Sequence, residues 1–118
     1  MSNLTLGQKQ RLFTKLQAQL VLWAYEQGYE LTLGDAFRDE RVHGAMGVKK
    51  SYSSANSSHK ERLAIDLNLF KNGTYLTTTE AHKPLGEYWK SLHPLCRWGG
   101  DFSTPDGNHY SMTHGGRA

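Results

Sequence analysis

The chain has 118 residues, of which 37% are hydrophobic and 21% charged, and its formal net charge is +3. This length indicates a single domain, residues 1–118, and the three Trp and six Tyr argue against disorder. The single Cys excludes an intramolecular disulfide and a Cys-based zinc site, and we find neither a membrane-spanning apolar run nor a secretory signal.

The N-terminal third predicts a helix followed by a strand. Thr5 and Gln8 form a capping-box pattern, and apolar residues recur at helical spacing over residues 8–27. Gly28 then suits the position just after a helix, and residues 29–33 alternate like a short strand. The polar stretch 39–58 is long for a connection, which is typical of a loop that frames a functional site.

Residues 63–70 predict the central strand, with an aliphatic face and a mixed face. The aliphatic face holds Leu63, Ile65, Leu67 and Leu69, and the mixed face holds Ala64, Asp66, Asn68 and Phe70. The pair Asn72-Gly73 predicts a hairpin turn into a return strand over residues 74–76.

The C-terminal part predicts a second helix, from about residue 79 or 84 to residue 92, in which Pro84 is the first residue or a break. Strands over residues 95–98 and 108–112 complete an α+β domain whose small antiparallel sheet packs against the N-terminal helix. The last four residues are expected to fray.

Asp66 is the main candidate for a metal ligand. Its carboxylate lies on a strand with an aliphatic opposite face, and burying an unpaired charge is costly unless a metal ion or a basic side chain compensates. His59, just before the strand, and His109, at the start of the last strand, supply two imidazoles. Two imidazoles and one carboxylate form a catalytic zinc set, although the H-x6-D spacing alone is not specific.

Asp106, three residues before His109, is placed to act as a general base, although an Asp in a Pro-Asp-Gly turn often bonds only the backbone. The four remaining histidines are expected to be solvated. They are His43, His82, His93 and His114.

The order and combined spacing of these residues resemble the D-alanyl-D-alanine carboxypeptidase and L-alanyl-D-glutamate endopeptidase family of zinc peptidases, which includes VanY-like enzymes and several phage endolysins. The matching positions are Ser57, His59, Ala64, Asp66, Trp98-Gly99-Gly100-Asp101, Asp106 and His109. The resemblance spans about residues 37–110. Arg62 replaces a Gly of the pattern, as in phage members, and Tyr110-Ser111 replaces an aromatic residue followed by Glu.

The resemblance implies a hedgehog/DD-peptidase-like fold with zinc held by His59, Asp66 and His109 and with Asp106 as the catalytic base. It also implies that Arg38 binds a substrate carboxylate or the oxyanion, although Arg38 could equally pair with a neighbouring Asp on the surface. Three further residues are expected to contact substrate: Ser57, Trp98 and Tyr110.

The function expected from this resemblance is zinc-dependent hydrolysis of a stem-peptide bond of bacterial peptidoglycan. The best match is an L-alanyl-D-glutamate endopeptidase acting as a monomeric phage endolysin, made in the host cytoplasm and reaching the wall through a holin. The alternatives are a D-alanyl-D-alanine carboxypeptidase or dipeptidase and a non-catalytic, zinc-stabilised wall-binding module. The absence of a basic stripe argues against nucleic acid, and no membrane insertion is expected.

Overall fold

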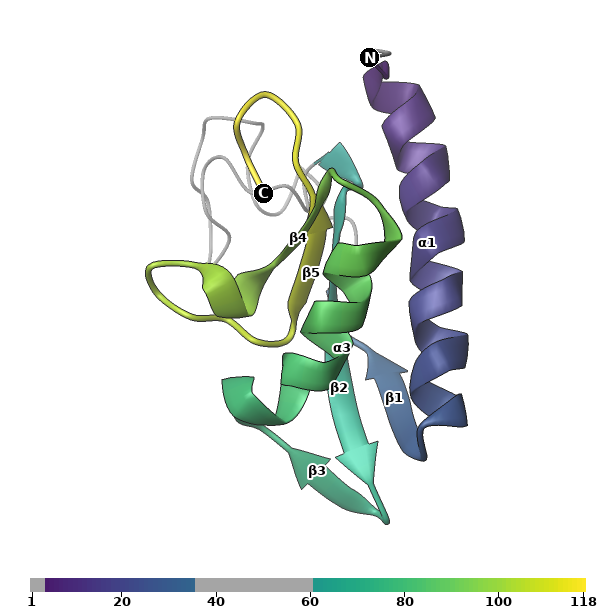
Figure 1. Cartoon of the computed structure of the whole chain (residues 1–118), viewed down its shortest axis with the longest axis vertical. Coiled ribbons are helices and arrows are strands. Elements are labelled where there is room, and N and C mark those ends of the chain that lie inside the picture. The colour runs from purple at the N-terminus through teal and green to yellow at the C-terminus, as the bar shows by residue number, and fades with distance from the viewer. Residues whose placement is uncertain (1–3, 36–60) are drawn as a thin grey trace.

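A computed structural model of the chain describes residues 4–35 and 61–118. Two helices lie on one face of an antiparallel sheet (Figure 1), which confirms the predicted α+β class.

The first helix, α1 (Leu6–Glu26), begins with the predicted capping box. The Thr5 hydroxyl accepts a hydrogen bond from the Gln8 N–H at 3.2 Å, and the Gln8 side chain accepts from the Thr5 N–H at 2.8 Å. Its buried stripe consists of Phe13, Leu16, Leu20 and Ala24. Gly28, with φ of 89°, ends the helix and leads directly into β1 (Tyr29–Leu33).

The central strand, β2 (Ala64–Lys71), has the two predicted faces, because Ile65, Leu67 and Leu69 are buried in the core together with Leu63 just before the strand. Asn72 and Gly73 both have positive φ, 53° and 76°, as a type I′ hairpin turn requires. The turn leads into β3 (Thr74–Leu76), which pairs with the second half of β2.

The last two strands, β4 (Cys96–Trp98) and β5 (His109–Met112), are separated by a short 3-10 helix, η2 (Gly99–Asp101). The strand order is β1-β2-β5-β4, all antiparallel. β5 pairs with the first half of β2, and β3 with the second half. β5, the last strand in sequence, therefore lies next to the central strand β2.

The second long helix, α3 (Thr79–Leu92), begins at the cap residue Thr78 and contains Pro84 in its interior. The prediction that Pro84 begins or breaks this helix was therefore wrong. A proline lacks the N–H that would reach the carbonyl of Glu80. Both residues are exposed, so water can satisfy that carbonyl. No helix in the described ranges is long and apolar enough to span a membrane.

The C-terminal tail is tied down, contrary to the expectation that it frays. Arg117 pairs with His114 in an isolated bridge, and its guanidinium donates to Glu61 Oε1 at 2.9 and 3.1 Å. On the other side, Lys9 Nζ of α1 lies 2.9 Å from His114 Nδ1. The C-terminal tail thus contacts both α1 and Glu61, which lies shortly before β2.

Candidate metal centre

Asp66 and His109 face each other across two neighbouring strands. The β2–β5 register pairs them directly, and the next pair, Leu67 and Asn108, is joined by a backbone hydrogen bond of 2.9 Å. Because hydrogen-bonded and non-hydrogen-bonded pairs alternate, Asp66 and His109 form a non-hydrogen-bonded pair, where side chains approach most closely. Asp66 Oδ1 lies 3.6 Å from His109 Nδ1.

The backbone of Asp66 is fixed on its other side as well. Its N–H donates to the carbonyl of Asp35, and its carbonyl accepts from the N–H of Gly34, both at 2.7 Å. The Asp66 side chain is 18% exposed and that of His109 is 8% exposed. The carboxylate and the imidazole therefore project from a rigid part of the sheet.

The turn before β5 brings Asp106 to the same place. The His109 N–H donates to the carbonyl of Asp106 at 3.1 Å, and the Asp106 N–H donates to the carbonyl of Gly99 at 2.9 Å. A Cβ atom on Gly99 would lie 2.1 Å from the Asp106 carbonyl oxygen and 2.8 Å from His109 Cβ. Only glycine allows this approach, which explains why the first Gly of the Trp-Gly-Gly-Asp segment is needed.

The three side chains suit a metal ion in chemistry and in spacing. Asp66, Asp106 and His109 each offer one ligand atom, and these atoms all lie within 4.8 Å of one another. Carboxylate oxygens and imidazole nitrogens are zinc donors, and two ligands of a tetrahedral zinc ion lie roughly 3.4 Å apart. The Asp66–His109 separation fits that value, whereas Asp106 is exposed at the rim.

Three predicted site residues, Arg38, Ser57 and His59, lie outside the described residues. Their roles as oxyanion partner, substrate contact and zinc ligand stay predictions. The described residues contribute Asp66 and His109 of the predicted ligand set, together with the predicted base Asp106.

Trp98 and Tyr110 belong to the core and not to a cleft, which corrects the prediction that they contact substrate. They are 4% and 0% exposed. Tyr110 follows His109 in a strand, so its side chain points to the opposite face of the sheet, and Trp98 is its register partner. Trp98 instead supports the site, because its indole N–H donates to the carbonyl of Gly107 at 2.8 Å.

Two histidines that were expected to be solvated are packed against other residues. His82 is 2% exposed, and its Nδ1 lies 2.7 Å from the Tyr110 hydroxyl. Burial lowers the pKa of His82 to about 4. The signal that could have placed His82 inside is its spacing, because it precedes the buried residues Leu85 and Trp89 by three and seven positions. His114 is partly buried against Lys9.

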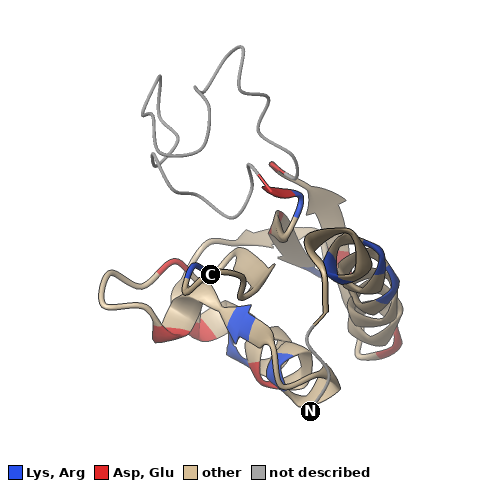
Figure 2. Cartoon of the chain, turned by 90° about the horizontal axis from the view of Figure 1, so that it is seen from above, with Lys and Arg blue, Asp and Glu red and all other residues tan. Residues whose placement is uncertain are grey.

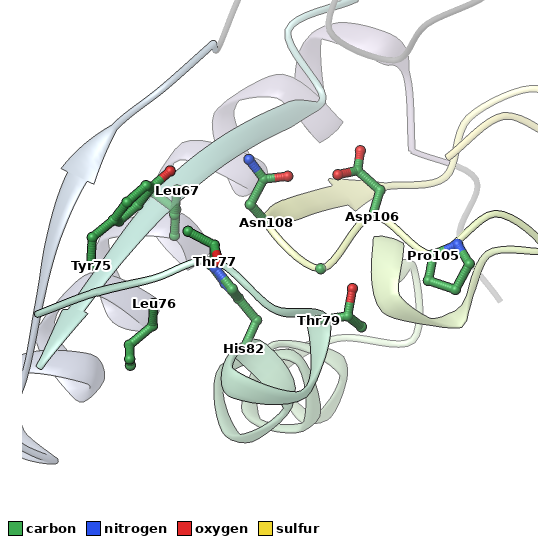
Figure 3. Close-up of a pocket in the computed structure, with 10 residues that line it drawn as sticks. Leu67, Tyr75, Leu76, Thr77, Thr79, His82, Pro105, Asp106 and Asn108 are labelled. Carbon is green, nitrogen blue, oxygen red and sulfur yellow. The ribbon is translucent and has the colours of Figure 1, made fainter.

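A pocket of about 220 Å³ adjoins the metal centre, with Asp106 in its wall. Figure 3 shows Asp106 and Asn108 on the loop before β5, across from Thr77, which precedes α3, and from Thr79 and His82 at the start of α3. The exposed carboxylate of Asp106 thus lies between the pair on the sheet and a polar hollow large enough for part of a peptide.

Charged residues of the described chain are interspersed by sign, as Figure 2 shows. One group has a structural role beside the site: Lys90 Nζ lies 2.8 Å from Asp101 Oδ2 and 2.9 Å from Glu87 Oε2. The hydrogen bonds that Lys90 donates to the carboxylates of Asp101 and Glu87 raise the pKa of Lys90. The Lys90–Asp101 pair joins α3 to η2.

Comparisons with known proteins give a family match and structural matches. Residues 51–112, more than half of the chain, match the family model described as D-alanyl-D-alanine carboxypeptidase, and this range contains Asp66, Asp106 and His109. The fold is similar to the crystal structure of the Serratia marcescens L-Ala D-Glu endopeptidase ChiX, with a TM-score of 0.63 and 17% identity over 85% of this chain and 79% of that chain. None of the curated proteins matches the sequence.

Proposed function

Because the chain belongs to the peptidase family that the D-alanyl-D-alanine carboxypeptidase model describes, we propose that it is a zinc-dependent peptidase of bacterial peptidoglycan. The bond that it hydrolyses lies in the stem peptide. One observation carries the proposal: Asp66, Asp106 and His109 converge within 4.8 Å, and Asp106 also lines the adjoining pocket.

The residues that would hold the zinc ion are His59, Asp66 and His109. When bound, zinc supplies Lewis-acid chemistry, which acidifies water and polarises a carbonyl group. The rigid backbone around Asp66 and the close pairing with His109 hold two of these three side chains ready for the ion.

Asp106 acts as the general base in this proposal. Its exposed carboxylate accepts a proton from the water that attacks the scissile carbonyl, so that a C–O bond forms. It then donates that proton to the amine as the C–N bond breaks. Arg38 pairs with a substrate carboxylate or the developing oxyanion through its planar guanidinium, and Ser57 hydrogen-bonds the substrate nearby.

The scissile bond that we propose is the one between L-alanine and D-glutamate. The resemblance of the motifs to phage endolysins supports this choice, and so does the fold shared with an L-Ala D-Glu endopeptidase. The corresponding biological role is that of a monomeric endolysin, made in the host cytoplasm and reaching the wall through a holin.

A D-alanyl-D-alanine carboxypeptidase is the second candidate, because the matching family model carries that description. A non-catalytic, zinc-stabilised wall-binding module is a third possibility. That module would leave the exposed carboxylate of Asp106 at the pocket without a role.

The test is mass spectrometry of purified peptidoglycan after digestion with the zinc-loaded protein. Fragments that begin with D-glutamate support the endopeptidase, whereas loss of a terminal D-alanine alone identifies the carboxypeptidase. The same digestion with Asp106→Ala and with a chelator should release nothing. If the unsubstituted protein releases no fragment from any wall type, the peptidase proposal is wrong.

A further inference from the structure

His82 has an unusual position for a buried histidine. It lies in the first turns of α3, 2% exposed, yet it lines the same pocket as Asp106. Figure 3 shows its ring rising from the helix toward Thr77, with Asp106 and Asn108 across the pocket. The imidazole of His82 therefore packs in the core and also lines the pocket.

The hydrogen bond with Tyr110 indicates which ring nitrogen of His82 carries the proton. The Tyr110 hydroxyl lies 2.7 Å from His82 Nδ1. A phenol O–H is a stronger acid than the N–H of a neutral imidazole, and an imidazole nitrogen is the better acceptor, so the hydroxyl donates its proton to Nδ1. A neutral imidazole with Nδ1 as acceptor carries its proton on Nε2. Burial keeps the ring neutral at physiological pH, since the pKa of His82 is about 4.

The pocket is polar but nearly uncharged. Thr77, Thr79 and Asn108 contribute uncharged polar side chains, and Asp106 is the one charged residue among the described residues that line it. A substrate carboxylate placed here would be repelled by Asp106, whereas an amide group is neutral and offers a carbonyl acceptor.

We propose that the Nε2–H group of His82 donates a hydrogen bond to an amide carbonyl of the substrate, which makes His82 a substrate-binding residue of this pocket. The substrate class is a neutral amide segment, such as a peptide unit or an N-acetyl group of a muropeptide. This inference rests on the proposed peptidase function and adds the residue that binds the segment next to the reacting bond.

A purely structural role for His82 makes a different prediction from a binding role. An Asn side chain can place an acceptor near the position of Nδ1, and so can keep the bond from Tyr110, but it has no donor at the Nε2 position. A Gln side chain can place its amide nitrogen near that position. His82→Asn should therefore raise KM for a soluble muropeptide about tenfold, whereas His82→Gln should raise it less, and kcat should change little in both.

The matched control is His93→Asn at the other end of α3, for which KM should stay unchanged. An unchanged KM in a folded His82→Asn variant would overturn the proposal, because it would leave only the structural bond to Tyr110. Failure of the unsubstituted protein to cleave any muropeptide would instead count against the peptidase function.

A second measurement keeps the native His82 side chain and its bond to Tyr110. In zinc-loaded Asp106→Asn protein, which binds without turnover, nitrogen-15 NMR can follow the Nε2–H resonance of His82. We expect that resonance to shift when a soluble disaccharide-peptide fragment is added. An unchanged resonance at saturating fragment would contradict the proposal, whatever the kinetics of the variants show.

Discussion

The indole N–H of Trp98 donates to the carbonyl of Gly107, 2.8 Å away, and this bond joins β4 to the turn that carries Asp106 and His109. Gly99, the next residue after Trp98, accepts the backbone N–H of Asp106 on the same turn. The Trp-Gly-Gly-Asp segment therefore supports the candidate metal centre through its backbone and a buried ring.

Replacing Trp98 by Phe should weaken both the fold and the site. The substitution leaves the Gly107 carbonyl without its donor, and an unsatisfied buried carbonyl costs about 1–3 kcal/mol. Urea denaturation should show a loss of that size, together with lower zinc affinity. Trp23→Phe, which keeps a ring against Tyr88, is the control and should lose less. Equal losses in the two variants would contradict a special role for Trp98.

Gly99→Ala should disrupt the candidate metal centre more severely than the addition of one methyl group usually does. The added methyl group would lie 2.1 Å from the backbone oxygen of Asp106 and 2.8 Å from His109 Cβ, so the turn must move. We expect zinc affinity measured by competition with a chelator to fall at least tenfold. Gly7→Ala is the matched control, since its nearest neighbour is a flexible Arg11 side chain at 3.4 Å and helix propensity favours Ala. Retained zinc affinity in Gly99→Ala would show that the close packing is unimportant.

Zinc stoichiometry separates ligands from the base. His59→Ala and His109→Ala should each bring bound zinc close to zero if the proposed assignment holds, because each substitution removes a proposed imidazole ligand. Asp106→Asn should keep zinc but reduce kcat by at least a hundredfold, as loss of a general base does. His114→Ala should retain zinc. If Asp106→Asn loses zinc while His59→Ala keeps it, Asp106 is the third ligand and the proposed assignment is wrong.

Acidification should destabilise the fold through His82. Its pKa of about 4 lies below the ordinary value of 6.5, so between these pH values the unfolded chain binds a proton that the folded chain does not. Stability is therefore fully present above pH 6.5 and declines by roughly 3 kcal/mol as the pH falls to about 4. Urea titrations at several pH values give the free energy of unfolding of the protein and of His82→Gln. The difference between these two free energies should shrink by that amount as the pH falls. A constant difference would mean that His82 does not cause the loss.

Much of the fold could be predicted because it depends on local rules. The capping box at Thr5, the Asn72-Gly73 turn and the two faces of β2 each follow from a few neighbouring residues. The alternation in β2 also placed Asp66 on the face away from the aliphatic core. The pairing of Asp66 with His109 is different, since the register of two strands distant in sequence depends on every turn between them.

The errors came from residues whose surroundings are set by distant segments. Pro84 is compatible with a helix because the carbonyl it leaves unbonded is exposed, and local propensity contains no such information. Trp98 and Tyr110 look like cleft aromatics in the family motif, yet their register as a pair places both in the core. His82 looked like a surface histidine because its partner, Tyr110, is 28 residues away.

The bonds at Glu61 couple both ends of the described chain to the segment that leads into β2. Arg117 near one end contacts Glu61 directly, and Gln10 of α1 donates to the Glu61 carbonyl at 2.8 Å. The motion of a domain or tag attached at either end would therefore be transmitted to Glu61, two positions after His59. In engineered fusions, the stiffness of the linker would become a variable that affects metal retention.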